Sequence, residues 1–247
     1  MLNVNQPDRQ AKQVDFLRGV PLFASLSEAN LIQLAEDFQS RTYRKGDIIF
    51  HQGDESQLLY ILVTGKVRIF HITPNGEETT VNIMARQQVL GEFAVIDGEP
   101  RSATAQAIGH CTLIGIRRDK FLHYLDTMSG LGLAMCQLLV NKVRWTTMYA
   151  ETIAQLDAAG QLLNLLLQYN EEFGQEIEAG KRYSLDLGLN QTDLASLIGA
   201  KRGWVNHILQ DWRSRGLIEF ERGTIIIVDL PRVQAELDNH IGVSRHR

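Results

Sequence analysis

The spacing of hydrophobic and polar positions changes along the chain from helical to strand-like and back to helical. Residues 8–20 and 26–35 carry apolar side chains at helical spacing, and Ser27 is placed to cap the second of these helices. From Arg41 onward, short apolar runs are broken by turn residues, which is typical of strands. The predicted strands are residues 47–50, 58–63, 66–70, 79–84, 103–108 and 111–116. Short antiparallel strands with Gly, Asn or Pro in the intervening turns favour a small jelly-roll barrel.

A long helix is predicted after the barrel, from Ser129 to Asp157, with a shorter helix over 117–128 before it. Positions on the long helix alternate steps of four and three, which is the period of a coiled-coil seam. The seam positions are Met135, Leu139, Lys142, Thr146, Tyr149, Ile153 and Leu156. This pattern predicts a homodimer formed by two such helices. A helix packed inside its own chain is the competing interpretation, because the run is short and the seam includes polar residues.

The last third of the chain has the pattern of a winged helix-turn-helix. Residues 157–160 interrupt the helix, Asp157 can cap a following helix over 161–169, and Gly160 predicts a hinge. After a polar, irregular stretch, helices over 190–199 and 200–213 follow each other directly. Two strands joined by a tight turn at Arg222-Gly223 then predict the wing.

The net charge of the chain restricts DNA binding to a local basic region. The chain has 247 residues and a formal net charge of −4, so any contact with DNA must come from a local basic surface. Residues 181–222 supply one, with seven basic side chains against five acidic ones. No apolar run reaches membrane-spanning length and the N-terminus lacks a signal-peptide core, so a cytoplasmic protein without a membrane partner is expected. Cys111 and Cys136 are predicted to be buried thiols.

The segment 91–105, Gly-Glu-Phe-Ala-Val-Ile-Asp-Gly-Glu-Pro-Arg-Ser-Ala-Thr-Ala, is the candidate for ligand binding. An arginine followed by small residues can direct a guanidinium, a hydroxyl and backbone N–H groups at one anion, and a nearby carboxylate can accept from a hydroxyl. The chemistry is that of a phosphate joined to a sugar. A surface salt bridge between Arg101 and a neighbouring acid is the alternative.

The chain resembles the cyclic-AMP receptor protein branch of a bacterial regulator superfamily. The features that carry the resemblance are the barrel with glycines in its turns, the Gly-Glu-Phe-Ala and Arg-Ser-Ala-Thr-Ala motifs, the long helix and the winged helix. The resemblance runs from about Phe16 to Val228. It implies an α+β fold in three parts: a cyclic-nucleotide-binding jelly roll over 1–128, a dimerisation helix over 129–157 and a winged helix-turn-helix domain over 158–247.

The resemblance also implies a role for each residue of the candidate segment. Arg101 would hold the cyclic phosphate, with Ser102 and the backbone of Ala103 completing the cradle. Glu92 and Gly91 would take the ribose 2′-hydroxyl.

The adenine base would meet the long helix. Thr146 falls where the family places the hydroxyl that contacts adenine, and Thr147 falls where the second chain contributes a residue that is usually serine. The implied ligand is cyclic AMP, acting as an allosteric effector without a metal.

The residues implied to contact DNA are Lys201, Arg202, Gly203, Asn206 and His207. Arg202 matches the arginine that reads guanine in the family, the commonest specific contact in the major groove. Gly203 stands where the family often has a base-reading glutamate, and His207 where it often has arginine. Trp204 replaces a small hydroxyl residue, and simple packing is its alternative role. The half-site is therefore expected to differ from the usual one.

These inferences predict a homodimeric, cyclic-AMP-dependent transcription factor with no catalytic activity, whose partners are double-stranded DNA and RNA polymerase. A relative that binds cyclic GMP, or binds DNA constitutively without nucleotide, is the alternative. A related oxygen sensor would need an N-terminal cysteine cluster, whereas the first cysteine of this chain is Cys111. A related haem-based sensor would need axial ligands in the barrel, for which His71 and His110 could be nominated, but the phosphate motif favours a nucleotide instead. A cupin-type metalloenzyme would need clustered histidines, and the chain has no His-x-His pair. A regulatory subunit of an enzyme would not need the winged helix.

Overall fold

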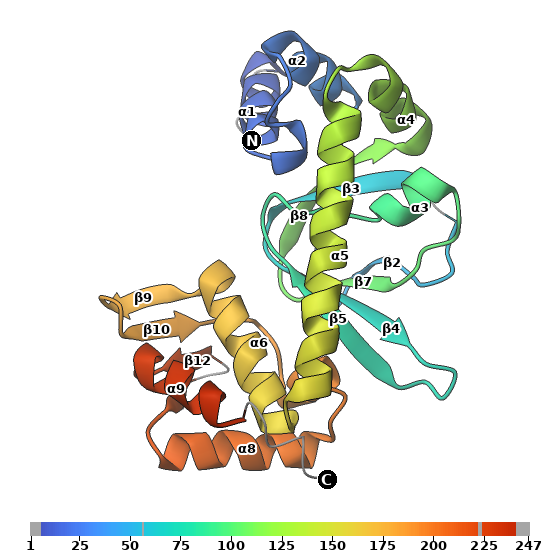
Figure 1. Ribbon diagram of the computed structural model, residues 1–247. Helices are drawn as coiled ribbons and strands as arrows, with labels where there is room; N and C mark the ends of the chain where they lie inside the picture. Colours follow the sequence, from blue (N-terminus) through green and yellow to red (C-terminus); the bar gives the residue numbers. More distant parts are fainter. Residues whose placement is uncertain (1–5, 56, 222–223, 241–247) are drawn as a thin grey trace. The chain divides into compact units, whose positions relative to one another are not determined.

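A computed structural model describes residues 6–55, 57–221 and 224–240. Contacts divide the chain into two compact units: one comprises Met1–Ile69 with Ile83–Arg144, and the other comprises Phe70–Asn82 with Trp145–Arg247. Figure 1 shows the elements of both units along the chain.

Two four-stranded sheets form the barrel. One sheet has the order β1 (Gln39–Tyr43), β8 (Cys111–Arg117), β3 (Leu58–Thr64) and β6 (Val89–Leu90). The other has the order β2 (Ile48–Phe50), β7 (Thr104–Ala107), β4 (Val67–Ile72) and β5 (Glu78–Met84). All six predicted strands are confirmed. The strands β1 and β6 escaped prediction because the sequence of β1 is almost entirely polar and β6 has only two residues.

Helices cover one end of the barrel. They are α1 (Gln6–Arg18), a short 3-10 helix (Pro21–Phe23), α2 (Glu28–Asp37) and α4 (Arg118–Thr127), and they gather around the start of α5 (Leu131–Gln155; Figure 1). Ser27 caps α2 as predicted, its hydroxyl accepting from the N–H of Asn30 at 3.3 Å. Fully buried side chains such as Leu17, Phe23 and Phe121 join these helices to β3 and β8 in one hydrophobic core.

The helix α5 has two apolar faces. Met135 packs into the core of the barrel unit, Lys142 forms an ion pair with Glu92, and the hydroxyl of Tyr149 donates to the carbonyl of Leu197. Met135 and Leu156 of the predicted seam are buried in their own chain, as the competing interpretation anticipated, whereas Thr146 and Ile153 are exposed. The pairing of two α5 helices stays a prediction. The large apolar side chains that α5 leaves exposed are Leu133, Val140, Val143, Met148 and Ile153.

The two cysteines lie in different surroundings. Cys111 is buried, as predicted, and burial raises the pKa of its thiol to about 11. Cys136 is exposed, so the prediction of a second buried thiol is wrong. Cys136 follows the buried Met135 directly, and one helical step turns its side chain about 100° away from the core.

The C-terminal unit has a helix-turn-helix and a four-stranded sheet of order β11, β12, β10 and β9. Its elements are α6 (Ala158–Phe173), β9 (Gln175–Glu178), β10 (Arg182–Leu185), α7 (Gln191–Leu197), α8 (Arg202–Ser214), β11 (Ile218–Glu221), β12 (Thr224–Ile227) and α9 (Leu230–His240). The antiparallel pairing of β11 with β12 confirms the wing, whose turn residues Arg222 and Gly223 lie outside the described residues. The strands β9 and β10 occupy the stretch expected to be irregular, because β9 is exposed at every position and therefore carries no apolar alternation.

The break between α5 and α6 is short. Asp157 caps α6 as predicted, its carboxylate accepting from the N–H of Gly160 at 2.8 Å. Gly160 lies inside α6, and a Cβ there would come within 2.7 Å of the Cβ of His240 in α9. The glycine therefore allows close packing of α9 on α6, and the interpretation that it gives the joint freedom is wrong. In the part of the chain that the structure describes, no helix is long and apolar enough to cross a membrane.

Candidate functional site

Arg101 is held by its backbone and by its side chain. Its N–H donates to the carbonyl of Asp54 at 2.9 Å, and its carbonyl accepts from Gly53 at 2.8 Å. The side chain is only 5% exposed. Nη1 donates to the carbonyl of Gly91 at 2.8 Å and Nη2 to that of Leu58 at 2.5 Å. This burial excludes the surface salt bridge as the role of Arg101.

The surroundings of the Arg101 guanidinium are apolar on one side. Its Cζ atom lies 4.2 Å from the centre of the Phe50 ring and 5.9 Å from that of Tyr60. Burial lowers the pKa of Arg101, although the guanidinium stays charged in any ordinary buffer. A buried cation whose hydrogen bonds go to backbone carbonyls keeps its full charge, and it is therefore well suited to hold an anion.

Gly91 is required by this arrangement in two ways. Its φ of +77° is left-handed, and a Cβ at this position would lie 1.9 Å from Nη1 of Arg101. Any other residue would therefore displace the guanidinium. The first glycine of the motif is explained by its close contact with an arginine ten residues later.

Glu92 begins the short helix α3 (Glu92–Asp97) and is 3% exposed. Its Oε1 accepts from Nζ of Lys142 on α5 at 2.7 Å, and the same ammonium donates to the carbonyl of Val89 at 3.3 Å. The ammonium also lies 5.6 Å from the centre of the Phe93 ring. Sequence reasoning missed Lys142 as a member of this site, although a lysine on an otherwise apolar helix face was the available signal.

The other predicted ligand residues are placed as follows. Ser102 is exposed and Ala103 is buried directly after Arg101, at the entry to β7. Thr146 and Thr147 are exposed on α5, and Thr146 follows Lys142 by one helical turn. The structure thus joins Gly91, Glu92, Arg101, Ser102 and Ala103 at one place in the barrel. The roles of both threonines stay predictions.

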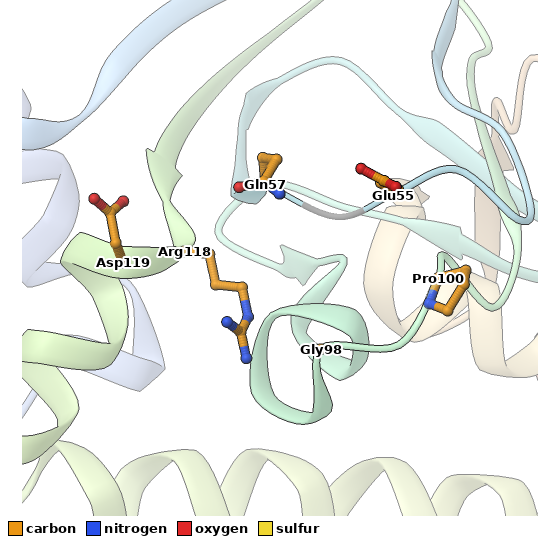
Figure 2. Close-up of a pocket in the computed structure, with 6 residues that line it drawn as sticks. All are labelled: Glu55, Gln57, Gly98, Pro100, Arg118 and Asp119. Atoms are coloured by element: carbon orange, nitrogen blue, oxygen red, sulfur yellow. The ribbon is translucent and has the colours of Figure 1, made fainter.

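A cavity of about 360 Å³ lies beside the C-terminal end of α3. Its lining residues are Glu55, Gln57, Gly98, Pro100, Arg118 and Asp119. Figure 2 shows the Arg118 side chain extending from the start of α4 toward Gly98. Nε of Arg118 donates to the carbonyl of Val95 at 2.8 Å, which ties α3 to α4. Arg101 and Glu92 do not line this cavity, although Pro100, the residue before Arg101, does.

The helix-turn-helix is capped and turned as its sequence dictates. The side chain of Asn190 accepts from the N–H groups of Thr192 and Asp193, and the Asp193 carboxylate accepts from the N–H of Asn190, forming a capping box. Gly199 has a φ of +60° between the two helices. The second helix, α8, buries Val205, Ile208, Leu209 and Trp212 as predicted.

The predicted DNA-contacting residues all lie on the exposed side of α8. They are Lys201 at its N-cap and Arg202, Gly203, Asn206 and His207 in its first two turns. The amide oxygen of Asn206 accepts from Nε2 of Gln191 at 3.1 Å, which orients that side chain from the preceding helix. Trp204 is exposed as well, so packing into the core is not its role. Within residues 6–55, 57–221 and 224–240, no group of three or more His, Cys, Asp or Glu side chains could hold a metal ion.

Comparisons with known proteins agree with both parts of this geometry. Residues 40–128 match the cyclic nucleotide-binding domain, and residues 159–236 match the Crp-like helix-turn-helix domain. A CRP-like cAMP-activated global transcriptional regulator of Mycobacterium tuberculosis is 26% identical, over 89% of this chain and 97% of that protein. A global nitrogen regulator of Synechococcus elongatus is 28% identical, over 76% of this chain and 85% of that protein. The structure of FixK2 from Bradyrhizobium japonicum is similar with a TM-score of 0.71 at 17% identity, over 83% of this chain and 98% of that one.

The fold and the site define a transcription regulator, not an enzyme, in which a cyclic-nucleotide-binding domain is joined to a helix-turn-helix domain. The chain therefore has both domains of the CRP-like regulators to which it is similar.

The Glu92–Lys142 pair makes a prediction about stability. Replacing Lys142 with methionine keeps most of the apolar stem but removes the ammonium that pairs with the buried Glu92 carboxylate, so the free energy of unfolding should fall by about 1–3 kcal/mol. Adding Glu92→Gln should restore most of that loss. Urea denaturation of the two single variants and the double variant gives the coupling energy.

The matched control is Lys120→Met. Lys120 lies 3.5 Å from Asp37 and its side chain is 52% exposed, so its loss should change stability by less than about 0.5 kcal/mol. Equal losses for both lysine variants, or additive effects of Lys142→Met and Glu92→Gln, would contradict a buried pair.

Proposed function

We propose that the protein is a cyclic-AMP-dependent homodimeric regulator that binds a two-fold-symmetric DNA site. The observation that carries this proposal is the buried Arg101 guanidinium, held by two carbonyls beside Gly91 and the Glu92 carboxylate. A buried cation next to a buried hydroxyl acceptor matches the two functional groups of a cyclic ribose phosphate.

The phosphate would bind the donors that Arg101 does not already use. A guanidinium has five N–H donors, and its hydrogen bonds to Gly91 and Leu58 use two of them. The exposed hydroxyl of Ser102 and the backbone N–H of Ala103 follow it in the chain and would complete the cradle. Glu92 would accept from the ribose 2′-hydroxyl while keeping its ion pair with Lys142, because a carboxylate has about four acceptor positions.

The base would be read by Thr146 and, from the second protomer, by Thr147. Both residues are exposed on α5, about 1.1 and about 1.4 helical turns beyond Lys142. A hydroxyl can both donate to and accept from the edge of a purine, so these two residues set the preference between adenine and guanine.

Dimerisation would use the second apolar face of α5. Leu133, Cys136, Val140, Val143 and Thr147 follow each other in steps of three and four, the period of a helical seam, and all five are exposed. Large apolar side chains in a continuous exposed stripe mark an interface. In this proposal the stripe takes the place of the buried positions Met135 and Leu156 of the predicted seam, and Thr147 would face the partner and reach the base of a nucleotide bound by the other protomer.

Two protomers would present two α8 helices to successive major grooves of DNA, with the wings alongside. Nucleotide binding at Arg101 and on α5 would favour one dimer arrangement over others, and that arrangement would bind DNA. RNA polymerase would be the protein partner of a cytoplasmic regulator of this kind.

Selection of bound sites from random DNA, with and without cyclic AMP, tests the proposal. The expected result is a two-fold-symmetric site that is recovered efficiently only with nucleotide. Recovery of the same site at equal affinity without nucleotide would overturn the nucleotide dependence.

The Lys142–Glu92 ion pair favours a second candidate, a regulator that binds DNA without any nucleotide. The ion pair compensates the charge of the buried carboxylate from within the chain, so the fold does not need a nucleotide for that purpose. Calorimetric titration with cyclic AMP and cyclic GMP separates the candidates. A binding heat with cyclic AMP supports the cyclic-AMP-dependent regulator, and a binding heat with cyclic GMP alone makes cyclic GMP the ligand. No binding heat with either nucleotide supports the regulator that binds DNA without nucleotide.

Thr146→Ala is expected to weaken cyclic-AMP binding by about tenfold and to leave dimerisation nearly unchanged, because it removes one hydrogen bond worth about 1–1.5 kcal/mol. Val143→Asp should have the opposite pattern, since it places a charge in the exposed stripe. Thr127→Ala, whose hydroxyl donates to the carbonyl of His123 in its own helix, is the control. Calorimetry and sedimentation measure both properties, and loss of the dimer with Thr146→Ala would make Thr146 an interface residue instead.

A further inference from the structure

The helix α8 carries an exposed aromatic side chain that its own fold does not use. Trp204 is 53% exposed, whereas Trp212 on the same helix is 1% exposed and belongs to its buried face. An exposed tryptophan leaves a large apolar area in contact with water, which is unfavourable unless something covers it. The position of Trp204 in the first turn of α8 places that area among the residues proposed to contact DNA.

The residue before Trp204 is equally unexplained by packing within the chain. Apart from its chain neighbours and the backbone of its own helix, a Cβ at Gly203 would meet no atom of the described residues within 4 Å, and the φ of Gly203 is not in the left-handed region. A glycine inside a helix costs about 1 kcal/mol relative to alanine, so packing within the described chain does not call for one here. Space beside Gly203 is useful only to a molecule that approaches α8 from outside.

His207 holds the Trp204 ring in a defined orientation. The two rings stack with their centres 5.5 Å apart and their planes 1° from parallel. At this separation the parallel rings are offset, so the imidazole covers only part of one indole face and the remainder of the ring stays exposed. Lys201 and Arg202 precede Trp204 closely in the chain, so the exposed indole has two cationic residues beside it.

We propose that Trp204 reads a thymine in each half-site by contact of its indole with the thymine C5-methyl group. That methyl is the apolar feature that the major groove presents on a base edge, and apolar side chains recognise it. Lys201 and Arg202 bring the helix onto the phosphates and a guanine, and the gap at Gly203 lets the neighbouring base pair come close to the backbone. This inference rests on the proposed DNA binding of α8 and names the base that this surface selects.

The test uses the full-length protein and its selected DNA site. Each thymine of the half-site is replaced in turn by deoxyuracil, which pairs identically but lacks the methyl group. Wild-type protein is expected to bind about fourfold more weakly for one substituted half-site, and about fifteenfold more weakly for both, at one thymine position. Trp204→Ala should bind the thymine and uracil probes equally.

Two variants keep the result specific. Arg202→Ala should lose guanine preference but keep the difference between thymine and uracil, and Trp204→Phe should keep part of that difference. Since Trp204 is exposed, Trp204→Ala should retain the circular dichroism spectrum and the Tm of the wild type.

The possible outcomes distinguish a failure of thymine recognition by Trp204 from a failure of the proposed DNA-binding function. Wild-type protein that selects no DNA sequence would overturn the proposed function together with the inference. Wild-type protein that selects a site but binds every uracil probe as tightly as thymine would overturn the inference alone. Full discrimination between thymine and uracil by Trp204→Ala would likewise overturn the inference and leave the proposed function standing.

Discussion

Arg101→Leu is expected to abolish nucleotide-stimulated DNA binding. The variant removes the buried cation that the phosphate would bind, and two lost charge-assisted hydrogen bonds correspond to a fall in nucleotide affinity of about two to four orders of magnitude. The basal affinity for DNA should stay unchanged because α8 is untouched. Fluorescence anisotropy of a labelled DNA site, measured over a cyclic-AMP titration, reports both quantities.

The same substitution also removes the donors to the carbonyls of Gly91 and Leu58, so a lower Tm is expected with dimerisation preserved. Arg101→Lys separates charge from geometry: it keeps the cation but cannot form the forked contact, and should recover only part of the affinity. Arg117→Leu is the control, since Arg117 lies in the same domain, is 66% exposed and forms a surface ion pair with Asp119. Normal stimulation of Arg101→Leu by cyclic AMP would contradict the site.

Arg202→Ala is expected to remove guanine preference at one position of each half-site. A bidentate arginine–guanine contact contributes about 1–3 kcal/mol of discrimination, so preference at that position should fall by about 5-fold to 150-fold while preference elsewhere is kept. Selection from random DNA followed by competition with single-base variants measures this change.

Lys201→Ala provides the contrast for that experiment. A lysine at the N-cap of α8 is placed to contact phosphate, so its loss should weaken binding uniformly across sequences and reduce the salt dependence. A uniform loss with Arg202→Ala would make Arg202 a phosphate contact as well.

Helix ends and turns could be predicted from the sequence because they depend on residues that are neighbours in the chain. Ser27, Asp157 and Asn190 cap helices as their positions indicate, because a side-chain oxygen before a helix accepts from its first N–H groups. The helix-turn-helix and the wing followed from the same kind of signal. The fold class was therefore predictable from turns, caps and periodicity.

Features that depend on distant partners could not be predicted. The periodicity of α5 identified an apolar face, but it did not distinguish the face that packs on the barrel from the face left exposed, since both repeat in steps of three and four. Gly160 was interpreted as a flexible joint because its neighbour His240 is 80 residues away in sequence. The Lys142–Glu92 pair joins two elements 50 residues apart, and no local pattern encodes such a contact.

Cyclic-AMP-dependent regulation requires that nucleotide binding and DNA binding are coupled, and this coupling can be measured from both sides. Cyclic-AMP affinity is determined by calorimetry for the protein alone and for its complex with the selected DNA, and DNA affinity is determined with and without saturating cyclic AMP. An allosteric regulator must show the same factor in both pairs of measurements, and a coupling of about 5-fold to 150-fold is expected. Failure of cyclic AMP to bind, or binding that leaves the affinity for DNA unchanged, would overturn cyclic-AMP-dependent regulation by this protein.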